Sequence, residues 1–238
     1  MGLSASISRV TEYYKRHGFV ETVRRAGLGA KRAMFANRMV VYCCELAALP
    51  AAAGTVPDSM RIVRLRNEGE IAASDREAIT SFWNPELARR NIRERFEKGA
   101  SLWLIRSAET LAGYGWTIQG RPIAPYYFPI TPGDVQFFDF FVFPKCRGRA
   151  MQGLLTAYIL RTLKGEGATR AFADTHEWNQ AQVASFKMTA FRPMGMVRTV
   201  TLFGRTFTRW VEARPAQQEK QARPAPRNAP AIARQHER

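Results

Sequence analysis

The residues best suited to chemistry lie in a basic turn between an apolar strand and an apolar helix. The stretch FVFPKCRGRAMQGLL covers residues 141–155 and places Arg147, Gly148 and Arg149 directly before the predicted helix. A helix N-terminus leaves backbone N–H groups unpaired and carries about half a positive charge, so it can bind a phosphate without any side chain. We interpret this turn as a candidate site for a phosphorylated cofactor, with an ordinary basic strand-to-helix turn as the alternative.

Two substitutions make the turn unusual. Loops that hold a pyrophosphate usually carry glycines, and this one has Ala150 and Gln152 in their place. Glycine lets the backbone approach the ligand closely, so Gln152 should crowd that approach unless its side chain turns away or donates a hydrogen bond itself.

Candidate proton acceptors occur on two predicted strands. Asp139 alternates with Phe137 and Phe141 on one face of an apolar run, where burial of a carboxylate is costly unless the group is paired or has a function. It could deprotonate an amine directly or through water, or it could pair with an arginine. His176 lies in the cluster DTHE at residues 174–177, at the carboxyl edge where open α/β sheets place ligands. It could act as a base, or it could be a solvated structural residue.

Two motifs resemble the GNAT superfamily of acyl-CoA-dependent N-acyltransferases, over roughly residues 60–212. The first motif is V-x-P followed by x-x-R-G-x-G-x-G, and it is matched here by Val142, Pro144, Arg147 and Gly148. The second is N-x-x-A-x-x-x-Y-x-K-x-G-F, matched by Asn179, Phe186 and Phe191, with Ala190 in place of Gly. Two imperfect motifs at the correct spacing are harder to obtain by chance than either one alone.

The resemblance implies an α/β (α+β) fold. Its central mixed sheet would be largely antiparallel, with one splayed parallel strand pair and flanking helices. It also implies that acetyl-CoA or another acyl-CoA is bound by Phe141, Val142, Arg147, Gly148, Arg149, Ala150, Met151, Gln152, Gly153, Asn179 and Phe186. In the family, the main chain of the central strand, here residues 140–142, stabilises the developing oxyanion, and the position of Asn179 binds the pantetheine arm.

The predicted function is an N-acyltransferase that moves an acetyl or other acyl group to a primary amine by direct attack on the thioester. Many family members have a tyrosine at the position of Phe186 that protonates the leaving thiolate. Phenylalanine cannot, so another acid, a water or unassisted departure must serve. Gln152 and Phe186 also allow a catalytically weakened acyl-CoA-binding module. A nucleic-acid-binding protein is a weaker alternative, because the basic residues are scattered and no nucleic-acid fingerprint is present.

The elements that must position these residues follow from periodicity and turn signals. A capping box at Ser74–Glu77 opens a helix that ends near Trp83, and Asn84-Pro85 starts a second helix that ends at Gly99. The run 135–143 is apolar enough for a central strand buried on both faces. The remaining predictions are strands at 60–65, 102–106, 111–118, 168–174, 194–202 and 206–211, and helices at 149–164 and 178–189.

Composition supports a folded chain with anionic ligands. Hydrophobic residues make up 46% and aromatic residues 11%, and 36 Lys+Arg against 20 Asp+Glu give a net charge of +16. This balance favours nucleic acid, an anionic membrane surface or a phosphorylated cofactor as partner. The three cysteines do not form a disulfide framework and indicate a reducing compartment, and the three histidines show no zinc spacing, so no metal is predicted.

The chain divides into four predicted parts. Residues 1–48 form a basic helical extension, with amphipathic helices at 4–17 and 20–35, and residues 49–58 form a linker. Residues 59–213 form the acyltransferase-like domain, and residues 214–238 a disordered basic tail. Residues 1–35 could contact an anionic membrane or a protein partner, or simply pack on their own domain.

Location and acceptor follow from weaker signals. The longest apolar stretch is too short and broken to span a bilayer, and no signal-peptide core is present, so a cytoplasmic protein is expected, with peripheral membrane contact as an alternative. The acceptor is expected to be a small-molecule or cell-envelope-precursor amine. The net charge suits an anionic one, and Tyr126, Tyr127 and Phe128 could line its site.

Overall fold

The computed structural model describes residues 14, 18–24, 27, 38–50, 56–82, 84–123, 129–202 and 205–212. Residues 18–24 are helical, whereas most of the predicted N-terminal helices, the centre of the predicted linker and the predicted tail lie outside the described residues. The aromatic loop residues at 126–128 also lie outside them. No helix in the described part of the chain is long and apolar enough to cross a membrane.

The described strands form one mixed sheet of eight strands. In spatial order they are β2 (Met60–Leu65), β3 (Ser101–Ser107), β4 (Thr110–Gln119), β5 (Asp134–Val142), β6 (Arg170–His176), β1 (Arg38–Glu45), β7 (Arg192–Leu202) and β8 (Arg205–Glu212). Neighbouring strands are antiparallel except for β5 and β6, which are parallel. The predicted fold class, a largely antiparallel mixed sheet with one parallel pair and flanking helices, is confirmed.

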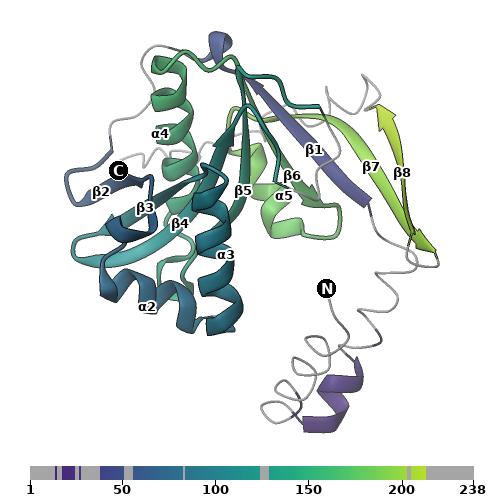
Figure 1. The fold of residues 1–238 in the computed structure, drawn as a ribbon, viewed down its shortest axis with the longest axis horizontal. Coiled ribbons are helices and arrows are strands. Elements are labelled where there is room, and N and C mark those ends of the chain that lie inside the picture. The colour runs from purple at the N-terminus through teal and green to yellow at the C-terminus, as the bar shows by residue number, and fades with distance from the viewer. Residues whose placement is uncertain are drawn as a thin grey trace, which may run out of the picture.

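Helices cover both faces of the sheet (Figure 1). Helices α2 (Ala73–Ser81) and α3 (Pro85–Glu97) pack on one face, and α4 (Met151–Gly165) and α5 (Gln180–Lys187) on the other. Successive side chains of a strand point to opposite faces of the sheet, so each strand contributes residues to the hydrophobic core on either face. In β3, Leu102 and Leu104 face α2 and α3, whereas Trp103 and Ile105 face α4. Short 3₁₀ turns occur at Leu46–Ala48, Glu68–Glu70 and Pro144–Cys146.

Strand β1 lies inside the sheet, between β6 and β7. Hydrogen bonds hold the segment directly after β1 in place. The Leu46 N–H donates to Thr169 O at 3.0 Å, and Lys164 Nζ donates to the carbonyls of Ala47 and Leu49 at 3.2 and 2.7 Å. The sequence prediction assigned residues 38–45 to the basic helical N-terminal extension. The structure places these residues in the sheet of the main domain, because the apolar residues Val41 and Tyr42 are buried there.

The two helices before β3 start in different ways. Asn84 caps α3 as predicted, accepting a hydrogen bond from the Leu87 N–H at 3.0 Å, and Pro85 occupies the first turn. The predicted capping box at residues 74–77 is wrong, because α2 starts at Ala73 and its N-cap, Ala72, makes no side-chain cap hydrogen bond. Ser74 therefore lies inside the first turn of the helix.

Candidate functional site

The site begins where the parallel strands β5 and β6 are joined. Their pairing runs from Asp134 opposite Arg170 to Phe137 opposite Ala173. Asp134 is fully buried, and Arg170 donates to both of its carboxylate oxygens at 2.8 Å. The Thr131 N–H and hydroxyl add hydrogen bonds at 2.8 and 2.7 Å. Burial alone would raise the pKa of Asp134, but the hydrogen bonds from Arg170 and Thr131 outweigh it and hold that pKa below its usual value.

Beyond Phe137 the strands separate, because β5 contains a bulge. In the register between β4 and β5, Trp116 faces Phe138 and Tyr114 faces Phe141, so β5 carries one residue more than β4 over this interval. Asp139 occupies the bulge with φ of +51°, in the left-handed region that non-glycine residues rarely adopt. The open end of the strand pair therefore exposes the edge of β5 that β6 no longer covers.

The bulge reverses the alternation of β5. Phe137 and Phe140 pack in the core on the α4 side, whereas Phe138 and Phe141 pack on the side of α2 and α3. The prediction that Phe137, Asp139 and Phe141 share one face is therefore wrong. The predicted burial of this strand on both faces holds only for its first half, because residues 138–142 are at least partly exposed.

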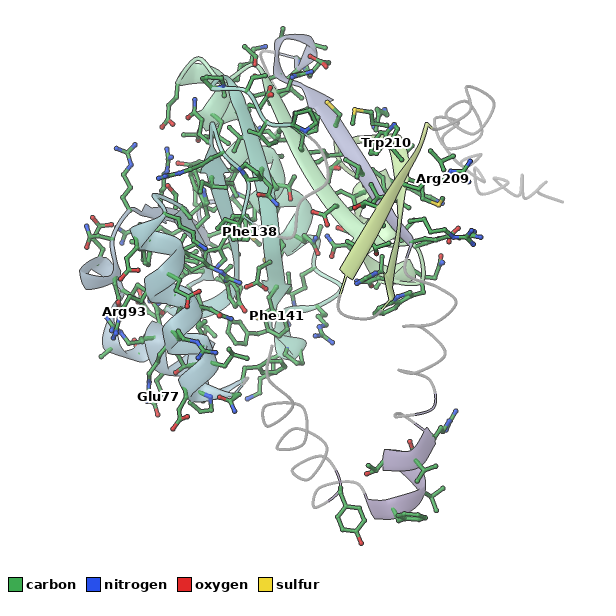
Figure 2. All side chains as sticks on the ribbon, turned by 45° about the vertical axis from the view of Figure 1, so that its right-hand side comes forward. Glu77, Arg93, Phe138, Phe141, Arg209 and Trp210 are labelled. Carbon is green, nitrogen blue, oxygen red and sulfur yellow. The ribbon has the colours of Figure 1, made fainter. Side chains whose placement is uncertain are left out.

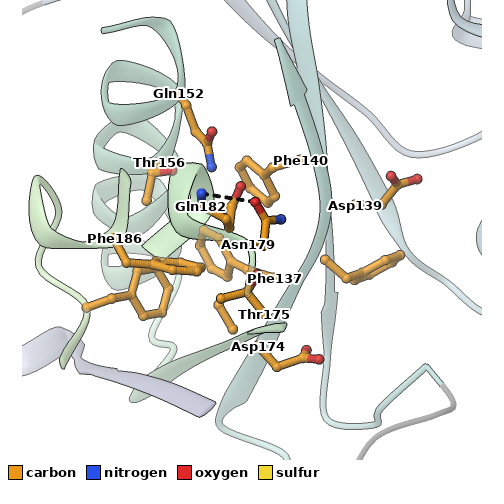
Figure 3. Close-up of a pocket in the computed structure, with 13 residues that line it drawn as sticks. Phe137, Asp139, Phe140, Gln152, Thr156, Asp174, Thr175, Asn179, Gln182 and Phe186 are labelled. Carbon is orange, nitrogen blue, oxygen red and sulfur yellow. Dashed lines mark hydrogen bonds between the residues drawn. The ribbon is translucent and has the colours of Figure 1, made fainter. Parts of the chain in front are cut away.

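Asp139 points to the α2–α3 side, across β5 from Gln152, Thr156 and Phe186 (Figure 3). Its carboxylate forms an ion pair with Arg95 of α3. The structure thus shows the predicted pairing with an arginine, and it also places Asp139 among the residues that line the cavity at the open end of the strand pair, so its role as a proton acceptor stays a prediction.

The basic turn before α4 has the shape that its sequence predicted. Gly148 and Ala150 have positive φ values of 78° and 55°, and the first hydrogen bond of α4 runs from the Leu154 N–H to Ala150 O at 3.0 Å. The N–H groups of residues 151–153 therefore lie in the unbonded first turn. The Arg147 side chain donates from Nε to Val142 O at 3.2 Å, and its guanidinium carbon lies 5.8 Å from the Phe141 ring centroid.

A groove of about 550 Å³ runs along this turn and the start of α5. Nine of the predicted cofactor-binding residues line it: Phe141, Val142, Arg147, Gly148, Ala150, Met151, Gln152, Gly153 and Asn179. Arg149 is exposed and does not line it, although it lies in the same turn. The volume is within the range of small-molecule sites.

A second cavity of about 180 Å³ adjoins the groove between the separated strands. Phe140, Gln152, Asn179 and Gln182 line both spaces, so the groove and the second cavity share these four residues as a common wall. Figure 3 shows the second cavity with the residues that line it. Asn179 caps α5, accepting a hydrogen bond at its side-chain oxygen from the Gln182 N–H at 3.3 Å. Gln152 does not turn away from the groove, so this substitution places an amide at the junction.

Asp174 lines the second cavity just past the end of strand pairing. Alternation along β6 places it on the face opposite Ala173, which packs on the α4 side. Burial raises the pKa of the Asp174 carboxyl to about 6. A carboxylate with this pKa is suited to accept a proton near neutral pH.

The remaining predicted residues have other surroundings. His176 stacks on Trp178, with ring centroids 5.0 Å apart, and is not among the residues that line either space. Phe186 lines the second cavity but is 7% exposed and stacks on Tyr42 at 4.3 Å, as part of the core. Among the described residues, no group of His, Cys, Asp and Glu could hold a metal ion.

The sequence analysis placed the cluster at residues 174–177 at the ligand-binding edge but assigned the possible base role to His176 and not to Asp174. It did not select Thr156, Gln182 or Arg95. Asp174 had a usable signal, because it ends a buried strand at the edge where parallel strands place ligands. Thr156 lies one helical turn after Gln152, and Gln182 occupies the Ala position of the second motif, three residues after Asn179, so their positions could have indicated them. Arg95 had no local signal, because its partner lies 44 residues away in sequence.

Solved structures with a similar fold include acetyltransferases. A putative acetyltransferase of the GNAT family from Novosphingobium aromaticivorans is 14% identical, with 67% of this chain and 61% of that chain covered and a TM-score of 0.46. A putative acetyltransferase from Salmonella typhimurium, solved with its cofactor acetyl-CoA, is 16% identical, with coverages of 65% and 94% and a TM-score of 0.42. A Bacillus subtilis acetyltransferase in complex with CoA is 13% identical, with coverages of 65% and 99% and a TM-score of 0.43.

The chain spans about three fifths of the Novosphingobium protein and 56% of a Drosophila protein of similar fold. No protein-family model and no curated protein matches the sequence.

Proposed function

We propose that the protein is an N-acyltransferase that moves an acetyl or another acyl group from acyl-CoA to a primary amine. The observation that carries this proposal is the groove at the first turn of α4 together with the adjoining cavity at the open end of the β5–β6 pair, where Asp174 lies. The groove offers unpaired backbone N–H groups, and the cavity offers a carboxylate with a raised pKa. This arrangement suits a phosphorylated acyl donor in the groove and proton removal in the cavity.

The residues at the first turn of α4 fit a pyrophosphate. Positive φ values at Gly148 and Ala150 turn the chain into α4. The N–H groups of residues 151–153 lie before the first hydrogen bond of the helix, so they can donate to a phosphate. Arg147 lines the groove and adds a cationic donor. Acyl-CoA would supply an activated acyl thioester, and the amide side chains of Gln152, Asn179 and Gln182 would hold its pantetheine arm.

The chain's own groups account for the rest of the chemistry. Asp174 can accept a proton from an incoming ammonium group, so that the amine attacks as a free base. Backbone N–H groups on the uncovered edge of β5, at residues 140–142, can stabilise negative charge that develops during acyl transfer. Holding donor and acceptor together in the groove supplies a further share of the acceleration.

The test is calorimetric titration of the purified protein with CoA and acetyl-CoA at two salt concentrations. The Arg147→Ala variant should weaken CoA binding by about 1–3 kcal/mol, since it removes a charge-assisted contact. Arg149→Ala is a matched control, because it removes the same charge from the same turn but from outside the groove. Equal, salt-sensitive losses in both variants would show only nonspecific attraction and would overturn the site assignment.

A weakened acyl-CoA-binding module is the second candidate, supported by Gln152 and Phe186. It differs from the enzyme in one measurable outcome, because it would bind acetyl-CoA without transferring the acetyl group to any amine in an acceptor screen. Release of free CoA that depends on the acceptor, followed with a thiol reagent, separates the two.

The acceptor class follows from charge. A net charge of +16 supports an anionic amine, such as a small-molecule or envelope-precursor amino sugar that carries a phosphate. The ammonium group of this acceptor would contact Asp174, and its phosphate would contact basic side chains of the protein. Turnover that is indifferent to acceptor charge and to ionic strength would contradict this class.

A further inference from the structure

We propose that Arg95 is a positioning residue that holds Asp139 in its left-handed conformation. In this way it sets the shape of the open edge of β5 and decides which side chains line the groove. The kinetic part of the test depends on the proposed function, whereas the structural part does not.

The backbone conformation at the bulge is energetically unfavourable, so contacts from neighbouring residues must stabilise it. Asp139 is a non-glycine residue with φ of +51°, a conformation that an L residue adopts at an energetic cost. The opposite strand is shaped to match, because a Cβ at Gly115 would lie 2.5 Å from the Phe140 ring. Phe140 thus occupies space that only a glycine leaves open.

Arg95 supplies support from outside the sheet. Its side chain is 19% exposed and forms the ion pair with Asp139. Its guanidinium carbon also lies 5.1 Å from the centroid of Trp116 and 5.4 Å from that of Phe138. These two aromatic residues are the register partners directly before the bulge, and their rings stack at 6.3 Å. The direction of the arginine is therefore fixed by three groups at once.

Loss of this support would change the groove through the strand register. A shift by one residue turns every later side chain of a strand to the opposite face. Phe140 and Val142 now pack on the α4 side, and Phe141 packs on the α2–α3 side. All three line the groove, so a regular strand without the bulge would rebuild its wall.

The kinetic test compares Arg95→Ala with two double variants. Arg95→Ala should lower kcat at least tenfold and should also raise the KM for acyl-CoA, because Phe140, Phe141 and Val142 line the groove that would hold it. Adding Asp139→Gly should restore most of kcat, since glycine adopts positive φ freely, whereas adding Asp139→Ala should not. Arg93→Ala is the control, because Arg93 lies two residues earlier in α3 (Figure 2), is 67% exposed and pairs at 3.7 Å with Glu68.

The structural test uses hydrogen exchange of residues 135–143 in the protein without substrate. Arg95→Ala should raise exchange there at least tenfold, Arg93→Ala should not, and the double variant with Asp139→Gly should return it toward the wild-type rate. If Arg95→Ala does not fold, Asp139→Gly is compared with Asp139→Ala, and the glycine variant should exchange more slowly and turn over at least five times faster.

The outcomes separate the two proposals. A wild-type protein without turnover would end the proposed function, yet the exchange pattern would still test the role of Arg95. Two results would overturn the role of Arg95. The first is an unchanged hydrogen-exchange rate of residues 135–143 in Arg95→Ala, and the second is that adding Asp139→Gly restores kcat no better than adding Asp139→Ala. The second result would instead indicate that turnover requires the Asp139 carboxylate itself.

Discussion

Asp134 and Asp174 lie at opposite ends of the same parallel strand pair, and their surroundings shift their pKa values in opposite directions. At the closed end, Arg170 and Thr131 compensate the fully buried Asp134 and keep its pKa low. At the open end, burial raises the pKa of Asp174 to about 6. Both carboxylates are desolvated, but only the first has cationic and hydrogen-bonding compensation that outweighs desolvation.

The difference separates a structural carboxylate, Asp134, from the proposed general base, Asp174. A compensated carboxylate stays ionised and joins β5 to β6, so the strands can separate further along without coming apart. A carboxylate whose charge is disfavoured binds a proton more readily, which a general base requires. The ion pair of Arg170 and Asp134 thus supports the geometry in which Asp174 can act.

The largest expected effect comes from breaking the closed end. Asp134→Asn should lower the free energy of unfolding by about 3 kcal/mol, because it leaves the partly buried Arg170 without its counter-ion. Urea denaturation measures this, and Glu94→Gln, at an exposed pair on α3, should cost less than about 0.5 kcal/mol. Because the folded pKa of Asp134 is low, the wild-type protein should lose this contribution as pH falls below about 4, and the variant should not.

A comparably large effect is expected on activity at the open end. Asp174→Asn should lower kcat about 100-fold, within the range for loss of a general base. Wild-type kcat should rise with pH through about 6 as Asp174 loses its proton, and this limb should vanish in the variant. A variant that keeps the limb would assign the proton transfer to another group.

The stability of the same Asp174→Asn variant should change in the opposite sense to that of Asp134→Asn. A raised folded pKa stabilises the protein at low pH and loses that contribution as pH rises through about 6. The amide variant should therefore be more stable than wild type at pH 8, by about 1–2 kcal/mol, and nearly equal to it at pH 4. Thermal unfolding at both pH values measures the difference, and destabilisation at pH 8 would contradict a desolvated charge.

The smallest expected effect concerns the start of α4. Ala150 has φ of +55°, where glycine is favoured, so Ala150→Gly should stabilise the protein by about 0.5–1 kcal/mol in denaturant titrations. Ala157→Gly, inside the same helix, should instead destabilise by about 1 kcal/mol. Equal losses in both would mean that the turn holds alanine without strain.

Most of the fold could be predicted because its signals are local. The cap at Asn84 and the turn before α4 each depend on residues that lie within a few positions of one another. The apolar runs of β3, β5 and β6 likewise required burial in any packing. The position of β1 could not be predicted, because strand order depends on which edges meet after the chain folds.

The sequence by itself therefore determined most of the elements, the mixed fold class and nine of the residues that line the groove, since each depends on short-range pattern. Tertiary structure alone decided the roles of the carboxylates. Asp139 was wrongly grouped with Phe137 on one face because a bulge at a non-glycine residue has no local signature, and its partner Arg95 comes from a helix 44 residues away. Asp134 and Arg170 are 36 residues apart, and whether a carboxylate is compensated depends on such distant partners and on burial that no window of sequence contains.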